Sequence, residues 1–233
     1  MKFKHFLLTR FNIGIYDRRQ RMRNGEMIDV ASWMVNRCLL FEKYCMPSVH
    51  AQTCKNFTWV IVCDPATPEV WLNTIQNMAK TDVIVGDNFR KASIKYIEKL
   101  LKDEDRVITT RLDNDDMLHR DCIKMIQGWV VRKERTGVVT LPKGWVWDIN
   151  KDKLWHVRER GNHFLTYVEK RGKKPVKTVL RHRHTALTDK FETFNVETPF
   201  HAWVEVVHGE NISNRGRGAK SDISQLKREE YGL

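Results

Sequence analysis

Apolar and polar residues alternate along the first 140 residues in a pattern that predicts strands separated by helices. Five apolar runs predict strands, at residues 6–9, 57–63, 82–86, 106–110 and 136–141. Between them, apolar residues recur at three- and four-residue spacing, which is typical of one face of a helix. The expected helices run from Met34 to Cys45, from Glu69 to Lys80, over 93–102 and from Cys122 to Trp129. This order favours an α/β fold, with a mixed, mostly parallel sheet flanked by helices.

The pattern changes after Pro142. Residues 144–147 and 153–157 predict a hairpin around a turn at 148–152. A helix over 163–171, a basic turn at 171–175, a strand over 176–180 and a mixed element over 198–208 are expected to follow. We therefore expect a single domain with two halves, residues 1–141 and 142–233.

The composition is that of a globular protein. The chain has 233 residues, of which 41% are hydrophobic and 30% are charged. It contains no apolar run near the roughly 20 residues that a membrane span needs, and its N-terminus does not resemble a signal peptide. We expect a cytoplasmic protein. Its five cysteines form no CxxC pair and predict free thiols, not a zinc site.

The chain is strongly basic, with 41 Lys and Arg against 29 Asp and Glu and a net charge of +12. Residues 151–184 hold 11 of the basic residues against 3 acidic ones, and they also hold four histidines. Such a local excess of positive charge predicts that the segment binds an anion or faces an anionic surface, such as nucleic acid, a membrane face or a phosphorylated substrate.

An acidic cluster, Asp113-Asn-Asp115-Asp116, directly follows the expected strand 106–110. Like charges this close repel one another, so a cation is expected beside them. Carboxylate oxygens suit Mg²⁺ or Mn²⁺, and ligands of open parallel sheets bind at the carboxyl ends of strands. The alternative is an acidic turn in which Asp116 caps the next helix.

Asp113-Asn-Asp115, preceded by a strand and Arg111, resembles the DxD motif of the nucleotide-sugar-dependent glycosyltransferases of the GT-A (Rossmann-like) fold. Residues 5–12, 41–49 with Gln52, 57–59 and 110–116 are similar to a family described as rhamnosyltransferases. The similarity is clearest over 5–120 and returns at Val207-His-Gly-Glu-Asn211. It implies transfer of a sugar, with inversion, from a nucleoside-diphosphate sugar to a hydroxyl of a glycan, lipid-linked or protein acceptor. Residues 1–141 would bind the donor, and 142–233 the acceptor.

The resemblance also implies roles for single residues. Asp113, Asp115 and His208, with His184 as the alternative histidine, would hold Mn²⁺ or Mg²⁺. The donor would be bound by Thr9, Arg10, Phe11, Asn12, Asp64, Arg111, Asp113, Arg181 and His184. Asp64 fits a structural role in a turn equally well, and residues 9–12 fit the end of a strand equally well.

An inverting transfer needs a carboxylate that takes the proton of the acceptor hydroxyl. Glu169 matches the position of the family's base, on a helix followed by a basic turn and a strand, although Lys170 stands where the family has an aspartate. Asp148 and Glu205 are the other candidates. Trp145, Trp147 and Trp155 fit either the core or an acceptor cleft.

The charge leaves a second class of function open, a nucleic-acid-binding protein or a metal-dependent nuclease. The arginine-rich segment 17–23 and Arg215-Gly-Arg-Gly218 favour it, but no helix-turn-helix, zinc finger or aromatic RNA-binding motif is present. The same charge also suits peripheral contact with an anionic membrane that carries a lipid-linked acceptor.

Overall fold

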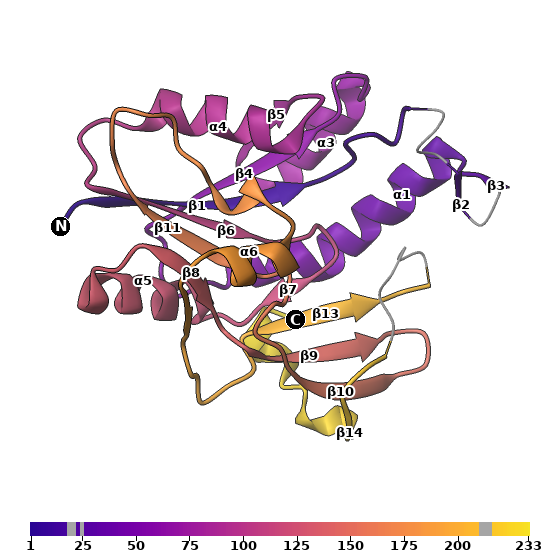
Figure 1. Cartoon of the computed structure of the whole chain (residues 1–233). Coiled ribbons are helices and arrows are strands. Elements are labelled where there is room, and N and C mark those ends of the chain that lie inside the picture. Colours follow the sequence, from indigo (N-terminus) through magenta and orange to yellow (C-terminus); the bar gives the residue numbers. More distant parts are fainter. Residues whose placement is uncertain (18–21, 24–25, 210–215) are drawn as a thin grey trace.

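A seven-stranded sheet runs through the middle of the molecule (Figure 1). The computed structural model describes residues 1–17, 22–23, 26–209 and 216–233. The order of the strands is β12 (Thr193–Asn195), β8 (Gly137–Thr140), β11 (Thr166–Lys170), β6 (Arg106–Arg111), β1 (Phe3–Arg10), β4 (Thr58–Cys63) and β5 (Asp82–Val85). Within this described sheet, only β11 runs against its neighbours, β6 and β8. The expected mixed, mostly parallel sheet is confirmed.

Helices cover both faces of this sheet because alternate side chains of its strands point to opposite sides. One core contains Leu7 and Ile61 and packs against α1 (Val30–Leu40), α3 (Glu69–Ala79) and α5 (Cys122–Lys133). The other contains Phe6 and Val60 and packs against α4 (Phe89–Leu100) and α6 (His184–Lys190). Figure 1 shows α4 and α5 on opposite sides of the sheet.

A continuous helical segment leads from α1 towards the second sheet. It begins at Asp29, whose carboxylate accepts the backbone N–H groups of Ala31 and Ser32. It widens into a π-helical turn, η1 (Phe41–Cys45), and continues as α2 (Met46–His50). Pro47 therefore lies in the first turn of α2, where a missing N–H is tolerated, and the helical segment continues past Cys45, its expected end.

A second sheet of five strands packs below the first (Figure 1). Its order is β14 (Ala219–Ser221), β10 (Lys153–Arg158), β9 (Lys143–Asp148), β13 (Trp203–Val207) and β7 (Met117–Leu118). The expected hairpin is β9–β10. Trp145 and Trp147 are buried in the core of this sheet, which confirms the core interpretation for these two tryptophans.

The two halves of the chain are interwoven. Residues 142–233 supply β11 and β12 to the first sheet, whereas residues 1–141 supply β7 to the second. Short elements complete the chain: β2 (Met22–Arg23), β3 (Glu26–Met27), η2 (Val179–Arg181), η3 (Ile223–Gln225) and η4 (Arg228–Tyr231).

Two sequence expectations after residue 160 are wrong. Residues 163–171 do not form a helix, because Thr166–Lys170 pair with both β6 and β8 as strand β11. Residues 176–180 do not form a strand. The N–H groups of Lys177 and Thr178 donate to the carboxylate of Glu169 instead of to a neighbouring strand, and the 3₁₀ turn η2 follows.

The five cysteines are free thiols, as expected. Within the described ranges, no helix is long and apolar enough to cross a membrane. Arg18, Arg19, Arg21 and Arg215, which suggested nucleic-acid binding, lie outside the described residues.

Candidate active site

The acidic cluster forms the loop between β6 and β7, at the carboxyl end of the central parallel strands. Leu112 continues the pairing of β6 with β1, since its N–H donates to the carbonyl of Leu8. The chain then turns, and Asp116 reaches the second sheet, where its Oδ1 accepts the backbone N–H of Val206 on β13. Asp115 and Asp116 are buried, whereas Asp113 is part-exposed. The structure therefore places two of the three carboxylates where water compensates their charge poorly.

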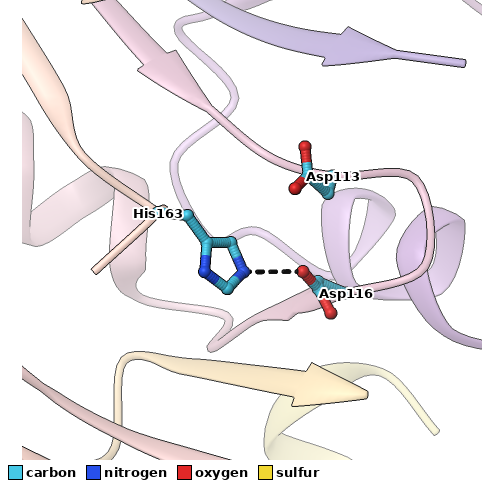
Figure 2. A group of neighbouring side chains, drawn as sticks. All are labelled: Asp113, Asp116 and His163. Atoms are coloured by element: carbon cyan, nitrogen blue, oxygen red, sulfur yellow. Dashed lines mark hydrogen bonds and ion pairs between the residues drawn. The ribbon is translucent and has the colours of Figure 1, made fainter. Parts of the chain in front are cut away.

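Asp113, Asp116 and His163 surround one small space (Figure 2). One ligand atom from each lies within 4.8 Å of the others, and Nε2 of His163 lies 3.0 Å from Oδ2 of Asp116. His163 reaches this position because it lies just before β11, the antiparallel neighbour of β6. Two carboxylates and an imidazole are a suitable donor set for Mn²⁺ and an acceptable one for Mg²⁺.

Electrostatics in this space also fit a cation. Burial and the charge of Asp115 raise the pKa of Asp116 to about 7. Burial lowers the pKa of His163, but its hydrogen bond to Asp116 outweighs this and raises it to about 9. The imidazole therefore holds a proton against Asp116 at neutral pH. A divalent ion would replace that proton and supply the positive charge that the carboxylates favour.

Asp115 faces a different set of partners. Nη1 of Arg37 lies 2.6 Å from Oδ2 of Asp115 and 3.1 Å from the amide oxygen of Asn114. Nε2 of His208 lies 2.9 Å from the same Asp115 oxygen. Burial raises the pKa of Asp115, but His208 and Arg37 outweigh it and lower the pKa below its usual value. The expected trio of Asp113, Asp115 and His208 is thus divided between two neighbouring clusters.

Comparisons with known proteins identify the family of this chain. A family model described as "Putative rhamnosyl transferase" matches residues 4–220. The chain belongs to this family. No curated protein sequence matches the chain. The sequence resemblance, drawn from the DxD motif and residues 5–120, is therefore confirmed for nearly the whole chain.

A solved structure agrees with a GT-A-like fold for this family member. TarS 1–349 of S. aureus, solved in complex with UDP-GlcNAc, matches with a TM-score of 0.50 at 11% identity over 91% of this chain. The chain spans 60% of that TarS fragment. A cytidylyltransferase from Leptospira borgpetersenii matches with a TM-score of 0.45 at 12% identity, over 87% of this chain and 77% of its own.

A basic cavity of about 380 Å³ adjoins the acidic cluster. It lies between the ends of β1 and β6, the start of α4 and the segment around α6. Its basic lining residues are Arg10, Arg90, Arg111, Arg183, His163, His182 and His184. Asp87 is the one acidic residue among the described lining residues. Burial and the charge of Arg111 lower the pKa of His184, which reflects the positive potential of the cavity.

Three residues expected to bind the donor in this family, Arg10, Arg111 and His184, line the cavity. Arg111 also holds Asp113, with Nη2 at 3.0 and 2.9 Å from its two carboxylate oxygens. Burial raises the pKa of Asp113, but Arg111, His163 and Arg10 lower it to about 2. Asp113 is therefore ionised and lies beside the cavity.

Other expected donor residues make contacts within the protein. Oγ1 of Thr9 accepts the indole N–H of Trp59, and Phe11 packs edge-to-face on Phe41. Oδ1 of Asn12 accepts the N–H of Asp64. These side chains hold the end of β1 against β4 and so position Arg10.

Two more expected donor residues are also held by protein groups. Oδ2 of Asp64 accepts the N–H of Gly14, which fixes the loop after β1. Arg181 does not line the cavity, since its guanidinium donates to the hydroxyl of Tyr167 and lies over the ring of Phe191. Arg183, two residues further on, lines the cavity instead.

The three candidate bases lie in different places. Glu169 is opposite Val107 on β6, three residue pairs, or about 10 Å, further from the end of the sheet than Thr166. Its carboxylate accepts two backbone N–H groups. Asp148 ends β9 beside Val207, the residue before His208. Glu205 is buried on β13, with Oε2 at 3.8 Å from Nδ1 of His163.

Sequence reasoning missed Arg37 and the pairing of His163 with Asp116. It included Asp116 in the acidic cluster that favours a cation, with helix capping as the alternative, but it did not name Asp116 as a metal ligand. A strand over 166–170, in place of the expected helix over 163–171, would have placed His163 at the sheet edge. Arg37 lies 78 residues from Asp115 on an otherwise ordinary helix face, and no local pattern marks it.

The buried pair of Arg37 and Asp115 gives a first prediction. Arg37→Met should lower the free energy of unfolding by about 3–5 kcal/mol, because it leaves Asp115 buried without its guanidinium. Denaturant unfolding measures this. Arg158→Met is the matched control, since the Arg158–Glu197 pair is exposed and should be worth about 1 kcal/mol or less. An equal loss of unfolding free energy in the two variants would contradict the larger contribution of the buried Arg37–Asp115 pair.

Proposed function

We propose that the protein is a metal-dependent glycosyltransferase that moves a sugar from a nucleoside-diphosphate sugar to an acceptor hydroxyl with inversion. The observation that carries this proposal is the Asp113, Asp116 and His163 cluster at the edge of a basic cavity, where β1 and β6 end. Family membership supports glycosyl transfer, and the TarS complex contains UDP-GlcNAc as that protein's ligand.

Each group of residues then has a task. Asp113, Asp116 and His163 would hold Mn²⁺ or Mg²⁺, and the metal would neutralise charge developing on the diphosphate leaving group. Arg10, Arg111 and Arg183 line the cavity and would bind the diphosphate oxygens. In the described part of the chain, neither Arg10 nor Arg183 has an ion pair, so both are available to an anion. Asp115 with His208 is the alternative metal-binding pair, although Arg37 competes for Asp115.

We assign the base to Asp148 and not to Glu169. Asp148 lies next to the His208 end of β13, on the same side as the acidic cluster. Glu169 is set back along β11, three residue pairs further from the end of the sheet than Thr166. The acceptor would be a glycan or a lipid-linked hydroxyl. The exposed Lys173, Lys174 and Lys177 support contact with an anionic membrane face on the cytoplasmic side.

The metal assignment predicts that Mn²⁺ raises the melting temperature further in the presence of a nucleoside diphosphate. His163→Gln and Asp116→Asn should lose that increment, because each removes one ligand, whereas the exposed His50→Gln should keep it. A thermal-shift panel of nucleoside diphosphates and nucleotide sugars, with and without Mn²⁺, measures this. If only Asp115→Asn and His208→Gln lose this increment in melting temperature, the metal ligands are Asp115 and His208 instead.

Turnover tests the function itself. Wild-type protein should release nucleoside diphosphate from one sugar donor of such a panel. A salt-sensitive mobility shift of DNA without any such release would favour the nucleic-acid-binding alternative.

Arg183→Gln should weaken donor affinity about tenfold or more and make it less dependent on salt, because one cation of the cavity is lost. Isothermal titration at several salt concentrations measures both. Lys190→Gln is the matched control: Lys190 ends α6, the helix that begins directly after Arg183, but does not line the cavity. Identical titrations for the two variants would mean that Arg183 faces solvent only.

Asp148→Asn should slow transfer by about 10²–10⁴-fold with little loss of donor affinity. The amide oxygen of asparagine can still accept the N–H groups of Asn150 and Lys151 that Asp148 now binds, so the turn should persist. Asp152→Asn in the same exposed turn should retain activity. If Asp148→Asn transfers sugar at the wild-type rate, Asp148 is not the base.

A further inference from the structure

Glu205 is a buried carboxylate that the proposed reaction does not use directly. It lies in the middle of β13, is 1% exposed and does not line the cavity. Its Oε2 lies 3.8 Å from Nδ1 of His163, on the side of the imidazole opposite Asp116. His163 therefore has a carboxylate at each ring nitrogen.

Arg217 fixes the orientation of this carboxylate. Its Nη1 donates to Oε1 of Glu205 at 2.7 Å, and its Nη2 lies 2.6 Å from Oε2. Nη2 also donates to Glu159, four residues before His163. The Nη2–Oε2 contact does not have hydrogen-bond geometry, so Oε2 is a buried oxygen that lacks a hydrogen bond within the described structure.

We propose that Glu205 is a positioning residue, which accepts the Nδ1–H of His163 and so reserves Nε2 for the metal. This inference rests on the metal site of the proposed function. A neutral imidazole carries one proton, and the partner of one nitrogen decides which nitrogen is left to bind a metal. Metal-binding histidines usually donate their other N–H to a carboxylate or carbonyl in this way. The two atoms are 3.8 Å apart, so a small rotation of the ring would be needed to form this hydrogen bond.

The two oxygens of Glu205 make this role testable. Arg217 can only donate, and so can the Nδ1–H of His163, so each needs an oxygen. Glutamine has one side-chain oxygen. In Glu205→Gln, Arg217 takes that oxygen, and the amide NH₂ faces Nδ1 of His163. The proton then moves to Nε2, which removes the lone pair that the metal needs.

Mn²⁺ affinity, measured by electron paramagnetic resonance on the full chain without substrate, tests the proposal. Glu205→Gln should weaken Mn²⁺ binding by about 10–100-fold. Glu159→Gln is the matched control, because Glu159 shares Arg217 but does not contact His163, and it should bind Mn²⁺ like wild type. In a His163→Gln background, Glu205→Gln should cause no further loss.

The positioning role of Glu205 would be overturned if Glu205→Gln bound Mn²⁺ with wild-type affinity. It would also be overturned if Glu205→Gln lost as much Mn²⁺ affinity in the His163→Gln background as in the wild-type background. If His163→Gln binds Mn²⁺ as tightly as wild type, the metal-ligand assignment above fails first, and the positioning role fails with it. A second test uses the wild-type protein and therefore does not depend on whether any variant folds. With Mg²⁺ bound, ¹⁵N NMR should find the His163 proton on Nδ1, and a proton on Nε2 would overturn the proposal.

Discussion

Three carboxylates within four residues, at the end of a strand buried on both faces, impose the constraint on which the arrangement of this protein depends. Water reaches Asp115 and Asp116 poorly, so the fold must bring positive charge to them. The cations come from distant parts of the chain: Arg37 from α1 and His163 from the start of β11. A helix, an antiparallel strand and the second sheet therefore meet at one loop.

The antiparallel strand β11 has a particular part in this convergence. A parallel strand at the same place would end, not begin, beside the carboxyl end of β6. Because β11 starts there, the residue just before it reaches the acidic loop, and its far end carries Glu169 to the segment after the basic turn. Glu169 then fixes the backbone that leads to Arg183 and the cavity wall. The same carboxylate, which we do not assign as the base, thus shapes the approach to the cavity.

The strands and helices of the first half could be predicted from the sequence, because each has a regular spacing of apolar residues and is bounded by a turn. Local patterns also located Asp113, Asp115 and the hairpin β9–β10. They failed over 163–180, where pairing with β6 and β8 outweighed the helix interpretation, and where the resemblance to a helix-borne base reinforced the error. Arg37 could not be found, because an arginine on a helix face is ordinary until the fold places Asp115 against it.

The two buried aspartates differ in how their charge is balanced, and this difference explains why a metal would prefer one of them. Asp115 is balanced by a guanidinium, which cannot give up its charge near neutral pH. A metal at that oxygen would have to displace Arg37 and leave it buried and unpaired. Asp116 is balanced by an imidazolium whose positive charge is a removable proton. Metal binding there would displace only that proton and would turn the same nitrogen into a ligand. Arg37 would thus direct a divalent ion towards Asp113, Asp116 and His163, next to the cavity lined by Arg10 and Arg183, which have no ion pair in the described part of the chain.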